Sequence, residues 1–492
     1  MRTKNLFRGV LITALYVLTY INVCGQEELL PDRPEQSQVL NLDLKKAIEI
    51  AISTNPTIKI ADMEIEKADY ARKEVIGSLF PNIGASASYQ RTIEKQVMAG
   101  LDPGAFTSGI ADMLTPIYEA LAEMGHPVMP PAQEEGSSEP MKIGMDNAWS
   151  AGFSAGMPLI NVPLWQSIKL TAEAVNSKVE AARASKIDMV AAVTEAFYGI
   201  LNAQDSYNVL LKSFETANEN LRIAKTRYEQ GMASEYDMIQ AEVQVKNMQP
   251  ALLSVQNGIE LAKLQLKVLM GVPSILPVSV VGTLADYERD MFEIVNISDV
   301  DTTLADNPTI RQLEVSAKLL ERQLKLQKAQ WYPTLSLSFV YQWISNNNDF
   351  KFSEYQIFPY SMAGVTLSFP IFQGGARYYK QKQARIAYDE MAYTMENVRQ
   401  QLGMQLQASI DQIRLSVEQI GSTLDAVALA EKGVTISQKR YEVGAGSSLE
   451  LISSENALTQ ARLNHYQSIY NYIVAKNALD KVLGNAYNEY VR

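Results

Sequence analysis

One motif occurs twice in this chain of 492 residues. RYEQGMASEYDMIQAE at 227–242 returns as RYEVGAGSSLELISSE at 440–455, an offset of 213 residues. Nearer the N-terminus, the tetrapeptide NPTI at 55–58 returns at 307–310, an offset of 252. Between positions 90 and 151 the offset falls by 40, so the first copy carries a long insertion there. The chain is therefore predicted to be one structural unit written twice.

Each copy contains a long helical stretch with a seven-residue apolar spacing. The spaced residues are Val193, Ile200, Tyr207, Phe214, Leu221 and Tyr228 in the first copy, and Leu406, Ile413, Ile420, Val427, Val434 and Tyr441 in the second. Such a repeat predicts left-handed superhelical packing. A stripe of mostly small residues, such as Ala217 and Ser416, runs beside each. Two packing faces favour a ring of helices over a simple pair, and residues 165–228 alone would span about 95 Å.

The duplicated motif lies where the spacing stops. Gly231 and Gly444 stand at positions typical of a left-handed helix end, and Ser234 and Ser447 follow as N-cap residues for a returning helix. Each copy is therefore predicted to form a long helical hairpin, with tips near 228–234 and 441–448.

Four other segments alternate apolar and small or polar residues, as in LSLSFVYQW. They lie near 81–91, 148–157, 333–343 and 362–369. One such segment would fit a half-buried strand of a soluble sheet, but four of them, each joined to a long helix, favour strands of a membrane β-barrel. Four strands cannot close a barrel, and open edges are not tolerated in lipid, so several chains would have to share one barrel.

The N-terminus predicts export. Residues 1–25 combine basic residues, an apolar run and Gly25, which is typical of a cleaved signal peptide. Cys24, the one cysteine, leaves lipidation as an alternative. No later stretch holds the roughly 18 uninterrupted apolar residues of a membrane-spanning helix. The net charge of −11 makes a nucleic-acid partner unexpected.

No pattern in the sequence predicts a catalytic site or a metal site. His126 and His465 have no metal-ligand partner at a useful spacing, and the carboxylate pairs lie in loops or on helix faces. We therefore expect no catalytic residue, no cofactor and no metal site, and the protein is not expected to be an enzyme.

Together these features resemble the TolC-type outer-membrane factors of tripartite efflux and secretion channels. The resemblance rests on LNLDLKKAIEIAISTNPTI at 40–58, its echo DVDTTLADNPTI at 299–310, the strand–proline junctions and both tip motifs. It implies a mainly α fold with a membrane β-barrel: a homotrimer whose chains share a twelve-stranded barrel above a long α-helical barrel. It also implies a Gram-negative outer membrane, with outer-membrane lipid, a periplasmic adaptor (membrane fusion) protein and an inner-membrane transporter as partners.

The resemblance further implies a periplasmic gate and adaptor contact at the tips. The matching residues are Tyr228, Gly231, Ser234, Asp237, Tyr441, Gly444, Ser447 and Glu450. Asp237 matches an acidic residue that hydrogen-bonds a tyrosine, here Tyr441, and Glu450 matches an acidic ring at the entrance. The chain departs from the family in having Gly446 where some members have arginine, and Ser453 where some have a second acid.

Because Gly446 stands where some members have arginine, two expectations remain for the positive charge of the gate. Either Arg227 or Arg440 replaces it, or the tip is held more weakly. The simpler interpretation of Tyr228 and Tyr441 is that they end the apolar stripes.

The resemblance divides the chain into a signal peptide (1–25), a first repeat (26–270), a linker in the periplasmic equatorial region (271–305) and a second repeat (306–492). The insertion falls in an extracellular loop, 92–147, where 110–124 could form an amphipathic helix. That loop is either disordered or folds inward in three copies and narrows the mouth. The alternative function is a coiled-coil periplasmic structural or adaptor protein, which would need one hairpin flanked by small β-domains.

Overall fold

The computed structural model describes residues 39–98, 103–125, 141–291, 303–351 and 355–485. The predicted signal peptide with Cys24 lies outside the described residues, as do His126, parts of the predicted loop and linker, and residues 486–492.

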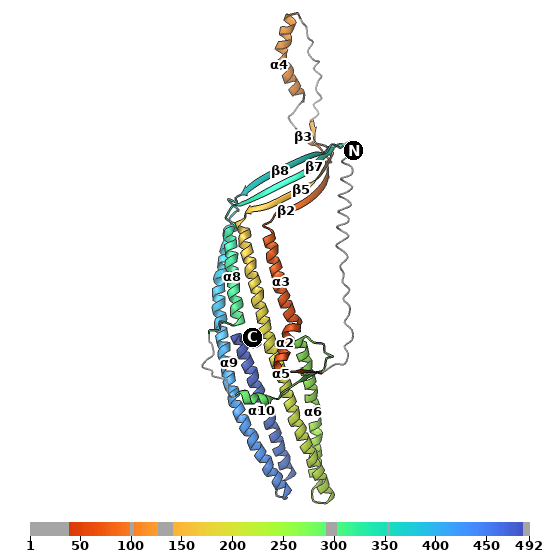
Figure 1. Cartoon of the computed structure of the whole chain (residues 1–492), viewed down its shortest axis with the longest axis vertical. Helices are drawn as coiled ribbons and strands as arrows, with labels where there is room; N and C mark the ends of the chain where they lie inside the picture. The colour runs from red at the N-terminus through yellow and green to blue at the C-terminus, as the bar shows by residue number, and fades with distance from the viewer. Residues whose placement is uncertain (1–38, 99–102, 126–140, 292–302, 352–354, 486–492) are drawn as a thin grey trace.

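Two helical hairpins occupy one end of the elongated molecule (Figure 1). The first consists of α5 (Val162–Glu229) and α6 (Glu235–Met270), with 68 and 36 residues. The second consists of α9 (Ala376–Glu442) and α10 (Ser448–Leu483), with 67 and 36 residues. The two copies of the sequence motif thus lie at the tips of two hairpins of matching lengths.

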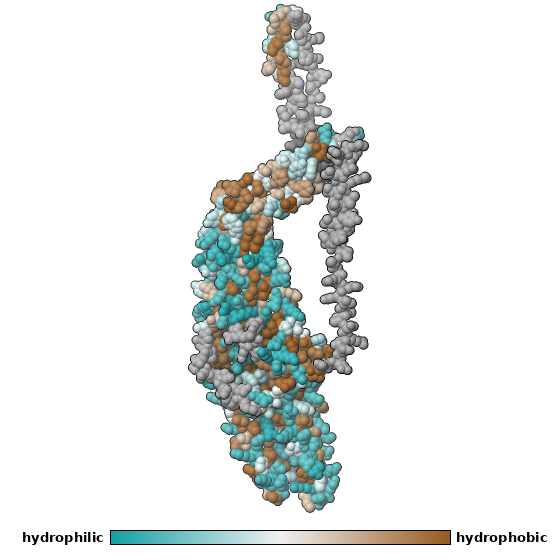
Figure 2. Space-filling model, viewed as in Figure 1, coloured by the Kyte–Doolittle hydropathy of each residue, from teal (hydrophilic) through white to brown (hydrophobic). Residues whose placement is uncertain are grey.

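A four-stranded antiparallel sheet lies beyond the other end of the long helices. Its order is β2 (Asn82–Arg91), β5 (Asn147–Ile160), β7 (Thr334–Asn347) and β8 (Phe358–Ser368). Large apolar side chains remain exposed on it; they include Ile83, Phe339, Val365 and Leu367. Figure 2 shows hydrophobic residues gathered where the sheet joins the helices, whereas the hairpins are largely hydrophilic on this face.

The insertion adds elements beyond the sheet, at the end opposite the hairpin tips (Figure 1). They are the short pair β3 (Gln96–Met98) and β4 (Met141–Ile143), and the helix α4 (Pro103–Glu123). The amphipathic helix expected at 110–124 therefore begins seven residues earlier. Its apolar residues Met113 and Ile117 are exposed.

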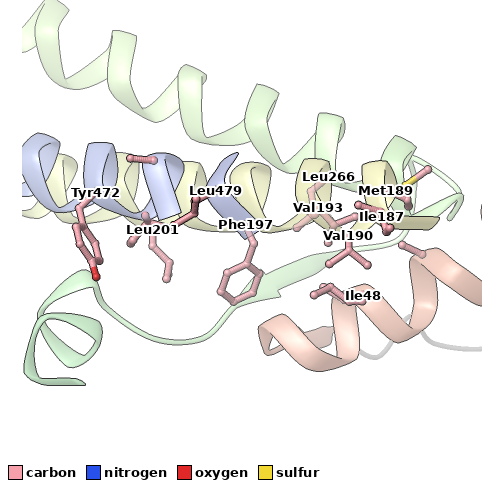
Figure 3. Packing of buried hydrophobic residues seen from close by; sticks show 14 of the residues in the cluster. Ile48, Ile187, Met189, Val190, Val193, Phe197, Leu201, Leu266, Tyr472 and Leu479 are labelled. Atoms are coloured by element: carbon pink, nitrogen blue, oxygen red, sulfur yellow. The ribbon is translucent and has the colours of Figure 1, made fainter. Parts of the chain in front are cut away.

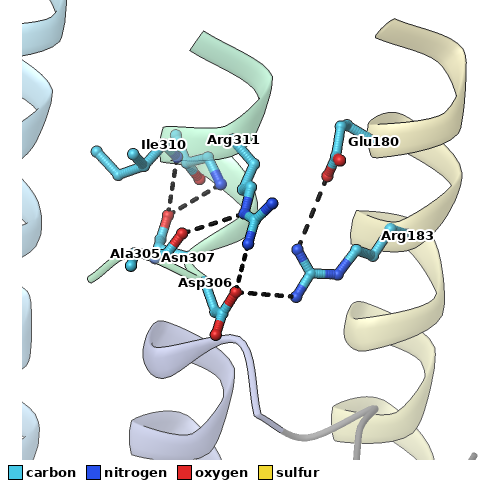
Figure 4. A network of polar contacts seen from close by, with 8 residues as sticks. Glu180, Arg183, Ala305, Asp306, Asn307, Ile310 and Arg311 are labelled. Atoms are coloured by element: carbon cyan, nitrogen blue, oxygen red, sulfur yellow. Dashed lines mark hydrogen bonds and ion pairs between the residues drawn. The ribbon is translucent and has the colours of Figure 1, made fainter. Parts of the chain in front are cut away.

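Two helices of 22 residues, α3 (Pro56–Gly77) and α8 (Pro308–Ala329), lead from the hairpin region to the sheet. Asn55 and Asn307 are the N-cap residues of these helices. The side-chain oxygen of each accepts a hydrogen bond from the main-chain nitrogen two residues later, as is common at helix starts. The repeated NPTI motif is thus the start of a repeated helix. Figure 4 shows Asp306, just before α8, bonded to Arg311 (2.6 Å) and facing Arg183 of α5 at 3.9 Å.

A layer of short elements, here called the equatorial layer, lies against the middle of the long helices. The strand β1 (Leu40–Leu42) pairs in parallel with β6 (Val278–Val280), α2 (Leu44–Thr54) follows β1, and α7 (Leu284–Met291) follows β6. The main hydrophobic core lies at this level, where Ile48 of α2 meets Val190 and Val193 of α5 and Leu266 of α6 (Figure 3).

Among the described residues, the structure contains no helix that is both long enough and apolar enough to cross a membrane.

Candidate gate at the hairpin tips

The tip of the first hairpin is held by local backbone bonds. Gly231 adopts a left-handed conformation with φ of 71°, which a residue without a Cβ adopts at no steric cost. The chain then re-enters a helix at Ser234, whose Oγ accepts a hydrogen bond from the Asp237 nitrogen (3.2 Å). The Asp237 carboxylate in turn accepts from the Ser234 nitrogen (3.3 Å) and hydroxyl (2.7 Å). Ser234 and Asp237 therefore form a capping box.

The tip of the second hairpin has the same turn, but its acidic residue, Glu450, has a different partner. Gly444 has φ of 76°, and the Ser447 Oγ accepts from the Glu450 nitrogen at 3.2 Å. The Glu450 carboxylate does not bond back to Ser447 but pairs with Arg440, with 2.9 Å between Arg440 Nη1 and Glu450 Oε1. Since both side chains are substantially exposed, this ion pair sets local charge more than stability.

Gly446 is glycine for a steric reason. Its nitrogen donates to the Arg440 carbonyl (3.0 Å), which draws the chain back over the helix end. A Cβ added at this position would lie 3.1 Å from the Arg440 Cβ and 3.2 Å from the Tyr441 nitrogen. The turn therefore leaves little room for a side chain at this position.

Arg227 makes a contact between the two hairpins. Its guanidinium lies over the Tyr441 ring, 4.7 Å from the ring centroid, and its Nη1 lies 3.5 Å from the Tyr441 main-chain oxygen. This contact joins the end of α5 to the end of α9. Of the two arginines considered from the sequence, Arg227 thus acts across the hairpins, and Arg440 acts within the second.

The expected bond between Asp237 and Tyr441 stays a prediction for an assembly of chains. In the single chain the Asp237 carboxylate is engaged by the start of its own helix. Tyr228 is 40 % exposed, whereas Tyr441 is half-buried beneath Arg227. On α5, between Asp205 and the tip, the buried residues are Ala217 and Ala224 of the small stripe and not the larger residues of the seven-residue spacing.

Above the tips, a polar pair that the sequence does not predict joins α5 to α10. Asn220 of α5 donates from Nδ2 to both Glu455 carboxylate oxygens on α10, each 2.8 Å away. Burial raises the pKa of the Glu455 carboxyl because it disfavours the charged form, and the Asn220 hydrogen bond opposes this shift. Each partner looks like an ordinary polar residue on its own helix, so no signal in either segment points to the pair.

A more deeply buried acid lies higher, at the equatorial level. Asp205 of α5 is 7 % exposed and accepts from the Leu284 nitrogen at the start of α7 (2.9 Å). Burial raises the pKa of the Asp205 carboxyl, this hydrogen bond opposes the shift, and the nearby Asp286 charge adds to it. Beside it, the His465 Nε2 lies 3.5 Å from the Glu288 carboxylate. Within the described residues these acids and the histidine form no cluster suited to a metal ion.

Known proteins share this architecture. The model of the family described as "Outer membrane efflux protein" matches residues 47–272 and 300–485. The outer membrane protein TolC of Vibrio cholerae is 20% identical over 344 residues, which is 68% of this chain and 76% of that protein. The alkaline protease secretion protein AprF of Pseudomonas aeruginosa is 22% identical over 300 residues, 60% of each chain.

The fold likeness extends over nearly the whole molecule. The crystal structure of the outer membrane protein VceC from Vibrio cholerae superposes with a TM-score of 0.66 at 15% identity, covering 90% of this chain and 96% of that one. The family match covers most of the sequence and includes both hairpins. This match confirms the resemblance of the motifs to TolC-type factors, and the chain belongs to the outer membrane efflux protein family.

Proposed function

We propose that this protein is the outer-membrane exit duct of a tripartite efflux or type I secretion system. It passively conducts substrates that an inner-membrane transporter delivers through a periplasmic adaptor. The observation that carries the proposal is one four-stranded sheet joined to two long helical hairpins, in a chain of the outer membrane efflux protein family.

The sheet supports a trimer in the outer membrane. In the described part of the chain, β2 and β8 are edge strands, and the sheet exposes apolar residues such as Ile83 and Leu367. Lipid does not satisfy the polar groups of an open edge, so the edges have to pair with those of other copies. Three copies would form a twelve-stranded barrel in outer-membrane lipid, with the hairpins extending into the periplasm as an α-helical barrel.

The tips are the proposed gate. Tyr228, Gly231, Ser234 and Asp237 lie at one tip of each copy, and Tyr441, Gly444, Ser447 and Glu450 at the other. The contact of Arg227 with the Tyr441 ring supports a closed arrangement in which the second tip rests on the first. In this proposal the adaptor docks on the tips and separates them, and nothing in the duct performs bond chemistry.

The experiment that tests the proposal combines location, mass and conductance. Membrane fractionation should place the protein in the outer membrane, native mass measurement in detergent should give a trimer, and planar bilayers should show channels. A folded monomer in detergent would contradict the shared barrel. Recovery in the soluble periplasmic fraction would instead favour the structural or adaptor alternative.

A further inference from the structure

Large apolar side chains are exposed at all four junctions between the sheet and the long helices. Phe80 and Tyr332 each stand directly before the proline that precedes a strand, β2 or β7. Ile160 at the end of β5, and Ile371 and Phe372 after β8, are exposed as well. Figure 2 shows hydrophobic residues gathered at this level. Aromatic and apolar side chains in such a band are typical of the boundary between a membrane and water.

A buried arginine fixes the turn between β8 and α9. Arg377, in the first turn of α9, is 6 % exposed. Its guanidinium donates to the main-chain oxygens of Pro370 and Ile371 (3.2 Å) and to that of Gln330 just after α8 (3.2 Å). It also lies over the Trp331 ring, 4.5 Å from the ring centroid. The turn is thus held in place, yet the Ile371 side chain is 82 % exposed, and apolar groups presented in this way mark a surface that something outside the chain covers.

The helix ends next to these junctions are strongly basic. They comprise the last eleven residues of α3 and α8 (67–77 and 319–329) and the first eleven of α5 and α9 (162–172 and 376–386). The four stretches carry eleven lysines and arginines against three acidic residues, a net charge of +8 in a chain whose total is −11. We call these lysines and arginines the basic collar. Eleven helical residues rise about 16 Å, so the collar begins at the apolar junctions and extends that far from the sheet.

The opposite end of the sheet has no such excess. Residues 91–98, 141–147 and 344–358 together carry four basic and four acidic residues. Outside the four stretches of the collar, the chain as a whole has a net charge of −19, which is the total of −11 less the collar's +8. Positive charge is therefore concentrated on one side of the sheet, where it joins the long helices (Figure 1).

Almost half of the collar has no charged partner. Some members pair with acids on their own or a neighbouring helix, as Arg322 does with Glu173 at 3.3 Å. Others are exposed and make no ion pair with any described residue; these are Arg72, Lys169, Lys328, Lys380 and Lys382. Each of the four helices contributes at least one of them. Lys380 and Lys382 lie about 200° apart around α9, so the unpaired charge is not confined to one side of that helix.

We propose that the basic collar binds the anionic phospholipid headgroups of the periplasmic leaflet, while the apolar junctions set its depth at the headgroups. The proposal rests on the proposed duct function, which puts the sheet in the outer membrane, and goes beyond it by naming a lipid class and the residues that bind it. Lysine and arginine next to an anionic lipid surface are attracted to it within about one Debye length, ~8 Å at physiological ionic strength. Their aliphatic stems can lie along the apolar junction while the charged ends reach the phosphates.

Bound phosphates would also relieve repulsion within the assembly. Three copies of the collar share one ring in the proposed trimer, and like charges brought together destabilise a compact assembly. Anionic lipid should therefore stabilise the trimer as well as hold it at a fixed depth.

The first test measures which lipid the trimer of the full chain retains. The trimer in a neutral detergent is mixed with phosphatidylglycerol, or with phosphatidylcholine of the same acyl chains, and native mass spectrometry counts the lipids bound. Retention of phosphatidylglycerol should exceed that of phosphatidylcholine severalfold at about 0.15 M salt, and the excess should shrink at about 1 M because salt screens exposed charges. Equal retention of the two lipids at the lower salt concentration overturns the proposal.

The second test makes the same change of charge at two places. The collar variant combines Lys169→Gln, Lys328→Gln, Lys380→Gln and Lys382→Gln. The matched control replaces four exposed, unpaired lysines of the hairpins, namely Lys212→Gln, Lys225→Gln, Lys246→Gln and Lys432→Gln. The collar variant should lose most of the preference for phosphatidylglycerol and most of the rise in trimer melting temperature that this lipid causes, whereas the control should keep both. If the two variants behave alike, the preference comes from net charge and the collar is not the site.

Conductance separates the collar from the duct. In phosphatidylcholine bilayers with a salt gradient, the collar variant should keep the reversal potential of the wild type. A shift towards cation preference with lipid retention unchanged would mean that these lysines face the lumen and an anionic cargo, which overturns the proposal. A wild type that conducts but shows no preference for phosphatidylglycerol leaves the duct function standing and refutes the collar. A wild type that forms no channel in either lipid refutes the duct function itself.

Discussion

Asn307 donates a hydrogen bond from its Nδ2 to the main-chain oxygen of Val482, 175 residues further along the chain and 2.7 Å away. The Oδ1 of the same side chain caps α8 at the Thr309 nitrogen (2.9 Å). One asparagine therefore joins the end of α10 to the start of α8. Asn55 does the same in the first repeat, where its Nδ2 donates to the Leu269 oxygen of α6 (2.7 Å).

Replacing Asn307 should destabilise the fold. Asn307→Ala removes an N-cap and leaves the Val482 oxygen without its amide donor, so we expect a loss of about 2–4 kcal/mol in the free energy of unfolding. Asn307→Asp keeps the cap but places a carboxylate oxygen against the Val482 oxygen at a buried position, so it should also destabilise the fold. Thermal unfolding followed by circular dichroism checks both; equal midpoints for wild type and Asn307→Ala would contradict the joint.

Two left-handed glycines should differ sharply in their tolerance of a methyl group. At Gly484, φ is 77° and an added Cβ would lie 2.1 Å from the Asp306 oxygen. At Gly231, φ is 71° but nothing lies within 4 Å of that Cβ. Gly231→Ala should therefore cost only the backbone strain, about 1–2 kcal/mol, and Gly484→Ala considerably more. The midpoints of thermal unfolding measure this, and similar midpoints would show that the α10–α8 joint yields easily.

Two substitutions of Tyr441 distinguish the two contacts that could hold the tip closed, the expected hydrogen bond to Asp237 and the contact with Arg227. Tyr441→Phe keeps the ring under Arg227 and removes only the hydroxyl that the expected Asp237 bond needs. Tyr441→Ala removes both, including a cation–π contact of about 0.5–1 kcal/mol in each copy. If the hydroxyl bond closes the gate, both variants should raise leak conductance and sensitivity to large antibiotics. An effect of Tyr441→Ala without one of Tyr441→Phe would assign closure to the Arg227 contact.

The Arg440–Glu450 pair should set ion preference at the entrance. Glu450→Gln removes a carboxylate from each copy near the proposed pore mouth and should reduce cation preference, as rings of acidic side chains favour cations. Arg440→Gln leaves Glu450 without its partner and should shift preference the opposite way. Reversal potentials in a salt gradient measure both changes. Unchanged potentials in the two variants would count against the placement of this pair at the pore mouth.

Deleting residues 96–140 tests the insertion. The deletion removes α4, whose apolar residues Met113 and Ile117 are exposed beyond the sheet. If three copies of this segment narrow the external mouth, the deletion variant should still form trimers, with higher conductance and greater susceptibility to bulky solutes. Loss of the trimer would make the insertion structural, and unchanged conductance would remove the idea of a lid.

Local patterns in the sequence were enough to predict the turns and the strands. A left-handed glycine followed three residues later by serine predicts a helix end and a new start, and both tips have this geometry at Gly231–Ser234 and Gly444–Ser447. Alternation such as LSLSFVYQW predicts a strand because its period matches the pleat, and β7 occupies that segment. These predictions succeed because the conformational preference resides in a few neighbouring residues.

Contacts between distant segments were decided only by the tertiary structure. Asn220 and Glu455 each look like an ordinary polar residue on a helix, yet the packing of α5 against α10 partly buries the Glu455 carboxyl and raises its pKa. Likewise, Arg227 was one of two arginines near the tips until the end of α5 was placed beside Tyr441. Periodicity specifies which face of a helix is apolar. The partner of a polar side chain depends on which segments, more than 200 residues apart in the sequence, pack against each other in the fold.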